Sequence, residues 1–173
     1  MRWIVLGLVM GWAQTWEVRA LFQAKSNGPI TLRLLSPEGE KVISTMLQNG
    51  KAQIQLPQDF RFSRVILTAE GHLPLVFSPK AALQGVIDFT NPALLHPQSA
   101  YVLVGEKAAL AAGDLGRLPD DPHPVINAYD IELFLQAERA QDKRADFNGD
   151  GKVDTGDFEI LLQNQGKLLQ TRL

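Results

Sequence analysis

The chain has 173 residues, of which 45% are hydrophobic and 21% are charged, and its net charge is −2. This balance is ordinary for one or two globular domains, and without a basic stripe it excludes nucleic acid and an anionic membrane surface as expected partners. The absence of cysteine excludes disulfides, thiol catalysis and cysteine-ligated zinc, so stability must come from core burial or from bound ions.

The first thirteen residues follow the order of a secretory signal peptide. Arg2 supplies a positive charge, Trp3 to Trp12 form an apolar run, and small residues continue to Ala13. The run is too short to span a bilayer. We expect residues 1–13 to be a signal peptide or a short membrane anchor, which would place the protein outside the cytoplasm, secreted or at the cell surface. The other interpretation is a first buried strand.

Residues 14–106 have the rhythm of short strands. Ala52, Ile54 and Leu56 alternate with polar residues, as in a strand with one buried face. Turn signals such as Asn49-Gly50 separate the segments at a spacing of about ten residues, which favours an antiparallel β-sandwich, Ig-like or prealbumin-like. The expected strands are Ile30–Leu35, Lys41–Met46, Lys51–Leu56, Ser63–Ala69, Leu73–Phe77, Gly85–Phe89 and Ala100–Val104.

The hydrophobic period changes to a helical one in residues 107–173. Two apolar stripes have helical spacing, and each is too short to be stable without a partner face. A shift of 27 residues superposes them, Asp130 on Asp157 and Asn127 on Asp154, so a loop–helix unit is duplicated. The two stripes consist of Ile131, Phe134 and Leu135, and of Phe158, Leu161 and Leu162.

The segment ADFNGDGKVDTGDF, Ala145–Phe158, places short oxygen-bearing side chains at alternate positions around a glycine. Counted from the first aspartate, this is the ligand order of an EF-hand calcium loop, in which a glycine makes the sharp turn and one ligand is a backbone carbonyl. Ca²⁺ is the expected ion, Mg²⁺ being less suited to so many carboxylates, and an acidic surface loop is the other interpretation. The expected ligands are Asp146, Asn148, Asp150, Lys152 through its carbonyl, Asp154 and Asp157.

This loop–helix duplication, with Asp157 where the usual EF-hand has Glu and with no amphipathic helix before Asp146, resembles the dockerin type I family over Ala112–Leu169. The resemblance implies a multidomain β plus α protein, in which the sandwich precedes an all-α dockerin-like pair of EF-hand-type loop–helix units at residues 107–173. The first repeat departs from the pattern, because His123 and Pro124 stand where an acid and a glycine belong.

The sequence therefore leaves three alternatives for the first loop: a filled calcium site, a distorted site and an empty one. Its ligands would be Asp114, Asp121, Asn127 and Asp130, and Asp114 fits only if about five residues bulge out of the loop.

The resemblance also implies a function. Dockerins anchor extracellular enzymes by docking on cohesin modules, so we expect a non-catalytic, exported, calcium-binding protein with a cohesin-like partner, linked to polysaccharide breakdown. The contact candidates are Tyr129, Gln136, Gln163 and Lys167.

The alternative is a carbohydrate-binding or enzyme-accessory sandwich, with a polysaccharide as its partner and the helix pair as a structural cap. Against catalysis, residues 17–105 contain no acid pair at motif spacing, and His72 and His96 have no nucleophile signature. Against a sugar platform, the aromatic residues of this region are more easily interpreted as core: Phe60, Phe62, Phe77 and Phe89.

Overall fold

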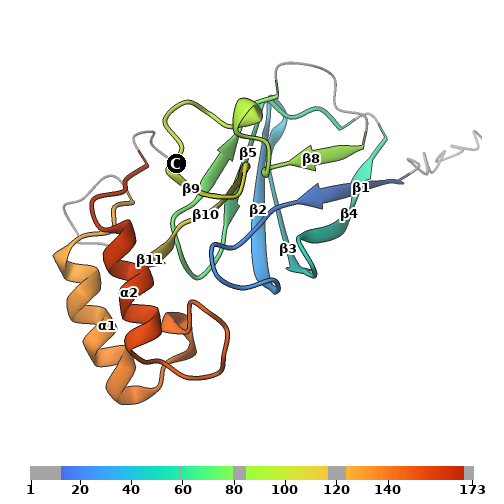
Figure 1. The fold of residues 1–173 in the computed structure, drawn as a ribbon. Helices are drawn as coiled ribbons and strands as arrows, with labels where there is room; N and C mark the ends of the chain where they lie inside the picture. The colour runs from blue at the N-terminus through green and yellow to red at the C-terminus, as the bar shows by residue number, and fades with distance from the viewer. Residues whose placement is uncertain (1–12, 59, 80–84, 117–123, 170–173) are drawn as a thin grey trace, which may run out of the picture.

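A computed structural model describes residues 13–58, 60–79, 85–116 and 124–169. It is mostly β, and Figure 1 shows two helices side by side at one end of a β-sandwich. Of the expected N-terminal signal segment, only Ala13 falls within these ranges, so that segment lies outside the described residues. No helix in the described part of the chain is long and apolar enough to cross a membrane.

The first sheet of the sandwich has the strand order β4-β1-β8. Its strands are β1 (Ala13–Arg19), β4 (Lys51–Pro57) and β8 (Val86–Asp88). β1 pairs antiparallel with β4 but parallel with β8, so the expectation of a purely antiparallel sandwich is wrong. The reason is topological: the chain enters β8 after a strand of the other sheet, not through a hairpin from β1 or β4.

The second sheet has the order β3-β2-β5-β7 and is antiparallel throughout. Its strands are β2 (Gly28–Ser36), β3 (Gly39–Leu47), β5 (Arg64–Thr68) and β7 (Leu75–Phe77). The chain crosses from this sheet to the first at Asn49 and Gly50, whose φ angles of 49° and 78° are both left-handed. Two such residues form the tight turn that the Asn-Gly pair favours.

The two sheets bury one hydrophobic core between them. In β1, β2 and β4 the buried residues alternate with half-buried or exposed ones, and Ala52, Ile54 and Leu56 all face inward. The β-sandwich is therefore confirmed. The aromatic side chains of Phe77 and Phe89 are fully buried in this core, and those of Phe60 and Phe62 pack against it.

Short strands link the sandwich to the helices. β9 (Tyr101–Val104) pairs with β10 (Lys107–Leu110), and β6 (Gly71–His72) pairs with β11 (Ala112–Asp114). A 3-10 turn, η1, covers Pro92–Leu94. The remaining elements are α1 (Ala128–Ala140), η2 (Lys143–Ala145) and α2 (Thr155–Asn164).

The helices do not form a separate all-α domain, and that part of the expected fold is wrong. Phe134 of α1 and Leu161 of α2 share a second core with Leu73, Ala111 and Ala112 of the β region. Ala112, at the start of β11, and Ala111 just before it supply part of the apolar face that a short helix lacks, so the helices gain their stability from strands as well as from each other. The expected division of the chain at residues 106 and 107 stays a prediction.

A buried polar contact fastens α2 to the sandwich. Asn164, at the end of α2, is 1% exposed, and its side-chain amide donates to Gln23 Oε1 at 2.5 Å and to the Ala112 carbonyl at 2.8 Å. The same Gln23 oxygen accepts from the Ala112 N–H at 3.3 Å. Because a buried amide is costly without partners, this arrangement favours one position of the helix end on the strands.

His72 lies where the two cores meet. Its ring is 5.0 Å from that of Phe22 and 6.2 Å from that of Phe147, and the residue is only 3% exposed. Nδ1 lies 2.7 Å from the Glu70 carbonyl, so it must donate, which leaves the lone pair on a buried Nε2 that has no hydrogen-bond partner among the described residues. Burial lowers the pKa of His72 to about 4.

This burial predicts a specific loss of stability in acid. Because the unfolded chain takes up a proton near pH 6.5 and the folded chain only near 4, the contribution of His72 is fully present above pH 6.5 and declines as the pH falls. We expect the free energy of unfolding to drop by up to about 3 kcal/mol from this residue alone between those pH values. Urea denaturation of His72→Gln across the same range should give a flatter pH profile than wild type. An identical profile would contradict this account of His72.

Candidate functional site: the acidic loop and the helix pair

The loop between η2 and α2 is folded around the side chain of Asp146. Its carboxylate accepts from the Gly149 N–H at 2.9 Å and from the Gly151 N–H at 3.1 Å. Both glycines have left-handed φ angles, 73° and 90°, which side chains other than glycine rarely adopt. The glycines of the motif therefore serve to curl the backbone around the first aspartate.

The middle of the loop is exposed and is held by local hydrogen bonds. Asn148 Oδ1 accepts from the Asp150 N–H at 2.9 Å, and the Asn148 side-chain amide donates to Asp150 Oδ2 at 3.1 Å. Asp150 Oδ1 accepts from the Lys152 N–H at 2.9 Å. Nearby, Lys143 donates from its ammonium to the Gly151 carbonyl.

Asp154 and Asp157 form a capping box at the start of α2. Asp154 Oδ1 accepts from the Gly156 N–H at 2.9 Å, and Asp157 Oδ2 accepts from the Asp154 N–H at 3.1 Å. Asp157 Oδ1 also accepts from the N–H groups of Phe147 and Asn148, at 2.7 and 3.0 Å. Asp157 is 0% exposed, so one buried carboxylate joins the beginning of the loop to the beginning of the helix.

Asp130 repeats this arrangement at the start of α1. Its Oδ1 accepts from the N–H groups of Leu115 and Gly116 at 2.8 and 3.3 Å, and its Oδ2 accepts from the Asn127 N–H at 2.8 Å. Asn127 completes a second capping box. Burial raises the pKa of the Asp130 carboxyl, while the three N–H donors act in the opposite direction.

The two units differ in length upstream of the caps. The caps Asn127 and Asp154 are 27 residues apart, whereas Leu115 and Phe147, which donate equivalent bonds, are 32 apart. The first loop is therefore five residues longer than the second, which equals the length of the bulge that Asp114 would need in order to act as a ligand. Asp114 lies at the position equivalent to Asp146. Asp121, His123 and most of the extra residues lie outside the described ranges.

The oxygen-bearing side chains are not assembled into a metal cage. Within the described ranges no three aspartate, glutamate or histidine side chains form a group that could hold a metal ion. Both oxygens of Asp146 and both oxygens of Asp157 accept from backbone N–H groups instead. The donor chemistry suits a hard cation such as Ca²⁺, but the same carboxylates also suffice to fold the loop.

The helix faces that carry the contact candidates are partly exposed. Gln136 and Gln163, which are equivalent in the repeat, are exposed, whereas Tyr129 and Lys167 are half-buried. Leu135 and Leu162 are 44% and 43% exposed, although the sequence assigned them to the buried stripes. Leu135 and Leu162 occupy equivalent positions in the two repeats. This equivalence is the sequence signal that would have indicated a shared exposed face.

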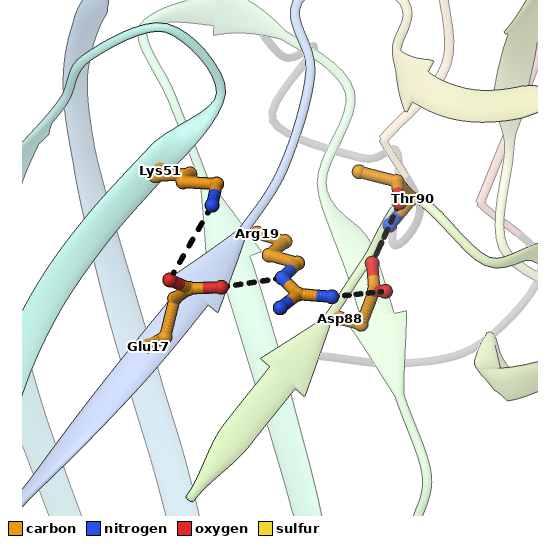
Figure 2. Close-up of polar contacts among 5 residues, drawn as sticks. All are labelled: Glu17, Arg19, Lys51, Asp88 and Thr90. Atoms are coloured by element: carbon orange, nitrogen blue, oxygen red, sulfur yellow. Dashed lines mark hydrogen bonds and ion pairs between the residues drawn. The ribbon is translucent and has the colours of Figure 1, made fainter.

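The outer face of the first sheet carries a ladder of ion pairs (Figure 2). Glu17 lies 2.5 Å from Arg19 Nε and 3.6 Å from Lys51 Nζ, and Arg19 also lies 3.9 Å from Asp88. Asp88 in turn accepts from the Thr90 hydroxyl at 2.7 Å. The hydrogen bond from Arg19 is the main cause that lowers the pKa of Glu17, so this carboxylate is suited to pairing and not to donating a proton.

Cavities formed by described residues have volumes of about 260 to 400 Å³, and the two of about 400 Å³ contain no histidine. One of about 260 Å³ is lined by Glu70, His72, Asp114 and Arg144, among others. This volume is below the usual range of pockets for small-molecule ligands. Its one hydroxyl, that of Thr68, donates to the Thr31 carbonyl, and its histidine is buried with Nδ1 bonded to the Glu70 carbonyl, so the two are not paired as nucleophile and base.

The chain matches no protein-family model and no curated protein. It is similar in fold to chains from two crystal structures of mutants of the type II cohesin–X–dockerin complex of Acetivibrio cellulolyticus. The TM-scores are 0.56 and 0.57, both at 17% identity, and the matches cover 90% and 92% of this chain and 97% and 98% of those chains. At this identity the likeness establishes a shared fold.

The likeness corrects two of the predictions. It extends over nearly the whole of a mostly β chain and is not confined to a helical pair at residues 107–173. The identification with the dockerin type I family, as a free-standing all-α domain, is therefore wrong. The cohesin-like partner was inferred from such a domain, and that prediction is wrong with it.

Because the capping carboxylates are buried, we predict that Asp157→Ala strongly lowers the free energy of unfolding in the presence of a chelator. Removing the carboxylate leaves three backbone N–H groups without their acceptor, which should cost about 2 to 4 kcal/mol in the free energy of unfolding. Asp130→Ala should behave alike, whereas Asp150→Ala, in the exposed part of the loop, should cost much less. Urea denaturation measures all three. If Asp157→Ala is as stable as Asp150→Ala, the carboxylate does not organise the loop.

Proposed function

We propose that the protein is a non-catalytic protein–protein interaction module of an extracellular multi-module assembly. The observation that carries this proposal is the fold shared, over nearly the full length, with chains of a cohesin–X–dockerin complex. A dockerin module is the partner that suits a mostly β chain of this kind. Such assemblies function outside the cell, which agrees with the expected export of the chain.

The absence of catalysis is part of the proposal. It is supported by the ion-paired state of Glu17 and Asp88 and by the hydrogen bonding and burial of His72, which leave the described sandwich without an evident acid–base pair. A carbohydrate-binding sandwich is less favoured, because among the described aromatic residues Trp16, Phe77 and Phe89 are buried and Phe60, Phe62 and Tyr101 pack partly against the core, whereas a sugar platform needs exposed rings.

The helix pair is the proposed contact surface. Leu135 and Leu162 expose apolar area at equivalent places on the two helices, next to the exposed Gln136 and Gln163. Apolar side chains surrounded by polar ones are typical of contact surfaces between proteins. Half-buried Tyr129, in the first turn of α1, and half-buried Lys167, just beyond the end of α2, complete the proposed contact residues.

Calorimetric titration with the separate dockerin and cohesin modules of the type II complex tests the partner. We expect saturable binding of the dockerin, weakened at least about tenfold by Leu162→Glu. Val42→Glu is the matched control, because Val42 is also exposed, at 58%, but lies in β3 at the edge of the second sheet. Binding of the cohesin in place of the dockerin would contradict the proposed partner, and equal losses in the two variants would contradict the proposed surface.

We further propose that the second loop binds one Ca²⁺ through Asp146, Asn148, Asp150, the Lys152 carbonyl, Asp154 and Asp157. When bound, the ion would neutralise four carboxylates that repel one another within twelve residues. The first loop, with Asp114, Asn127, Asp130 and the undescribed Asp121, is proposed to bind more weakly or not at all, because Pro124 cannot replace a glycine at the turn.

Titration of the chelator-treated chain with Ca²⁺ checks this proposal. We expect one strong site per chain, lost in Asp150→Ala and retained in Lys152→Ala, because only the backbone of Lys152 is used. Both substitutions lie in the exposed middle of the loop, and melting curves of the two variants in chelator separate a loss of binding from a loss of folding. The absence of a heat signal at millimolar Ca²⁺, or equal affinities for both variants, would contradict the calcium proposal.

A further inference from the structure

Lys25 extends from the segment between β1 and β2 to the acidic loop. Its stem lies between two glycines: a Cβ added at Gly149 would be 3.2 Å from Lys25 Cβ, and one added at Gly28 would be 3.6 Å from its Cε. Its ammonium lies 5.1 Å from the centre of the Phe22 ring. The side chain is therefore packed between the sandwich and the loop and is half-buried.

The charges around Lys25 are mainly those of the loop. Burial lowers the pKa of its ammonium, and the carboxylates that counteract this are, in order, Asp146, Asp157 and Glu70. Two of these three are proposed calcium ligands. Lys25 comes from the sandwich, so it is a cation that the first part of the chain brings to carboxylates of the last part.

We propose that Lys25 is the internal counter-cation of the acidic loop: it stabilises the loop in the metal-free chain and opposes the binding of a divalent cation there. The second half of this proposal rests on the proposed calcium site. The first half does not, because it concerns the loop as the structure has it.

The reason is electrostatic. An ammonium near enough to Asp146 and Asp157 to interact with their charges offsets their repulsion in the metal-free loop, and because it is only half-buried, salt still weakens this attraction. A cation bound to the same carboxylates would be repelled by that ammonium. The calcium affinity of the loop would thus depend on a residue of the sandwich.

The test compares Lys25→Met with Lys41→Met in the full-length chain. Methionine keeps most of the apolar stem and removes the charge. Lys41 is a matched control because its ammonium also lies over a ring, 5.8 Å from the centre of Phe60. It lies opposite Leu34, near one end of the β2–β3 pair, whereas Gly28, beside Lys25, lies at the other end.

We expect Lys25→Met to lower the dissociation constant for Ca²⁺ about three- to tenfold at low ionic strength, and Lys41→Met to leave it unchanged. In chelator at low salt, Lys25→Met should lower the melting temperature more than Lys41→Met does, and added salt should narrow that difference. An unchanged or weaker calcium affinity in Lys25→Met would overturn the opposing role of Lys25.

The calcium titration and the melting curves in chelator together separate a failure of the calcium proposal from a failure of the Lys25 proposal. If neither wild type nor Lys25→Met binds Ca²⁺, the calcium site and the opposing role of Lys25 are both rejected. The melting curves in chelator then decide the remaining role. A salt-sensitive loss in Lys25→Met supports the counter-cation, and a loss that is absent or insensitive to salt overturns it.

Discussion

The buried amide of Asn164 is the contact on which the relation between the sandwich and the helices depends. It joins three segments that are far apart in the sequence: the end of α2, strand β11 through Ala112, and the segment after β1 through Gln23. Hydrophobic burial alone is not directional, so the second core could hold the helices in more than one position. A buried amide that needs all its hydrogen-bond partners selects one of these positions.

The contact at Gly71 adds a steric constraint to this polar one. A Cβ at Gly71 would lie 2.4 Å from the Arg144 carbonyl oxygen, so η2 packs directly on the backbone of β6. Together with His72, Phe147 and Lys25, this close approach places the acidic loop against the sandwich. The charges and the conformation of the loop therefore depend on residues of the sandwich. No such dependence would exist in a free-standing helical domain.

The sequence predicted those features that depend on local periodicity. The strand alternation of Ala52, Ile54 and Leu56 and the Asn49-Gly50 turn were predictable because each reflects a short-range preference. The parallel pairing of β8 was not, because it depends on the path of the chain between two sheets. The shared second core was missed because Ala111 and Ala112 are too small to signal a packing face.

The candidate site was predictable in its residues and not in its geometry. A carboxylate at the third position of a helix can coordinate an ion or can cap the helix, and the pattern of Asp154 and Asp157 suits both. Only the structure reveals that Asp130 and Asp157 are buried and accept three N–H groups each. Lys25 was not identifiable, because its distance from the loop along the chain conceals their proximity.

The buried contacts of Asn164 should make the sandwich and the helix pair unfold as one unit. Native-state hydrogen exchange, followed residue by residue in chelator, tests it most directly. We expect the most protected amides of α2 and those of β2 and β5 to exchange with the same free energy, equal to that of global unfolding. Exchange of α2 at a clearly lower free energy, with the strands still protected, would contradict it.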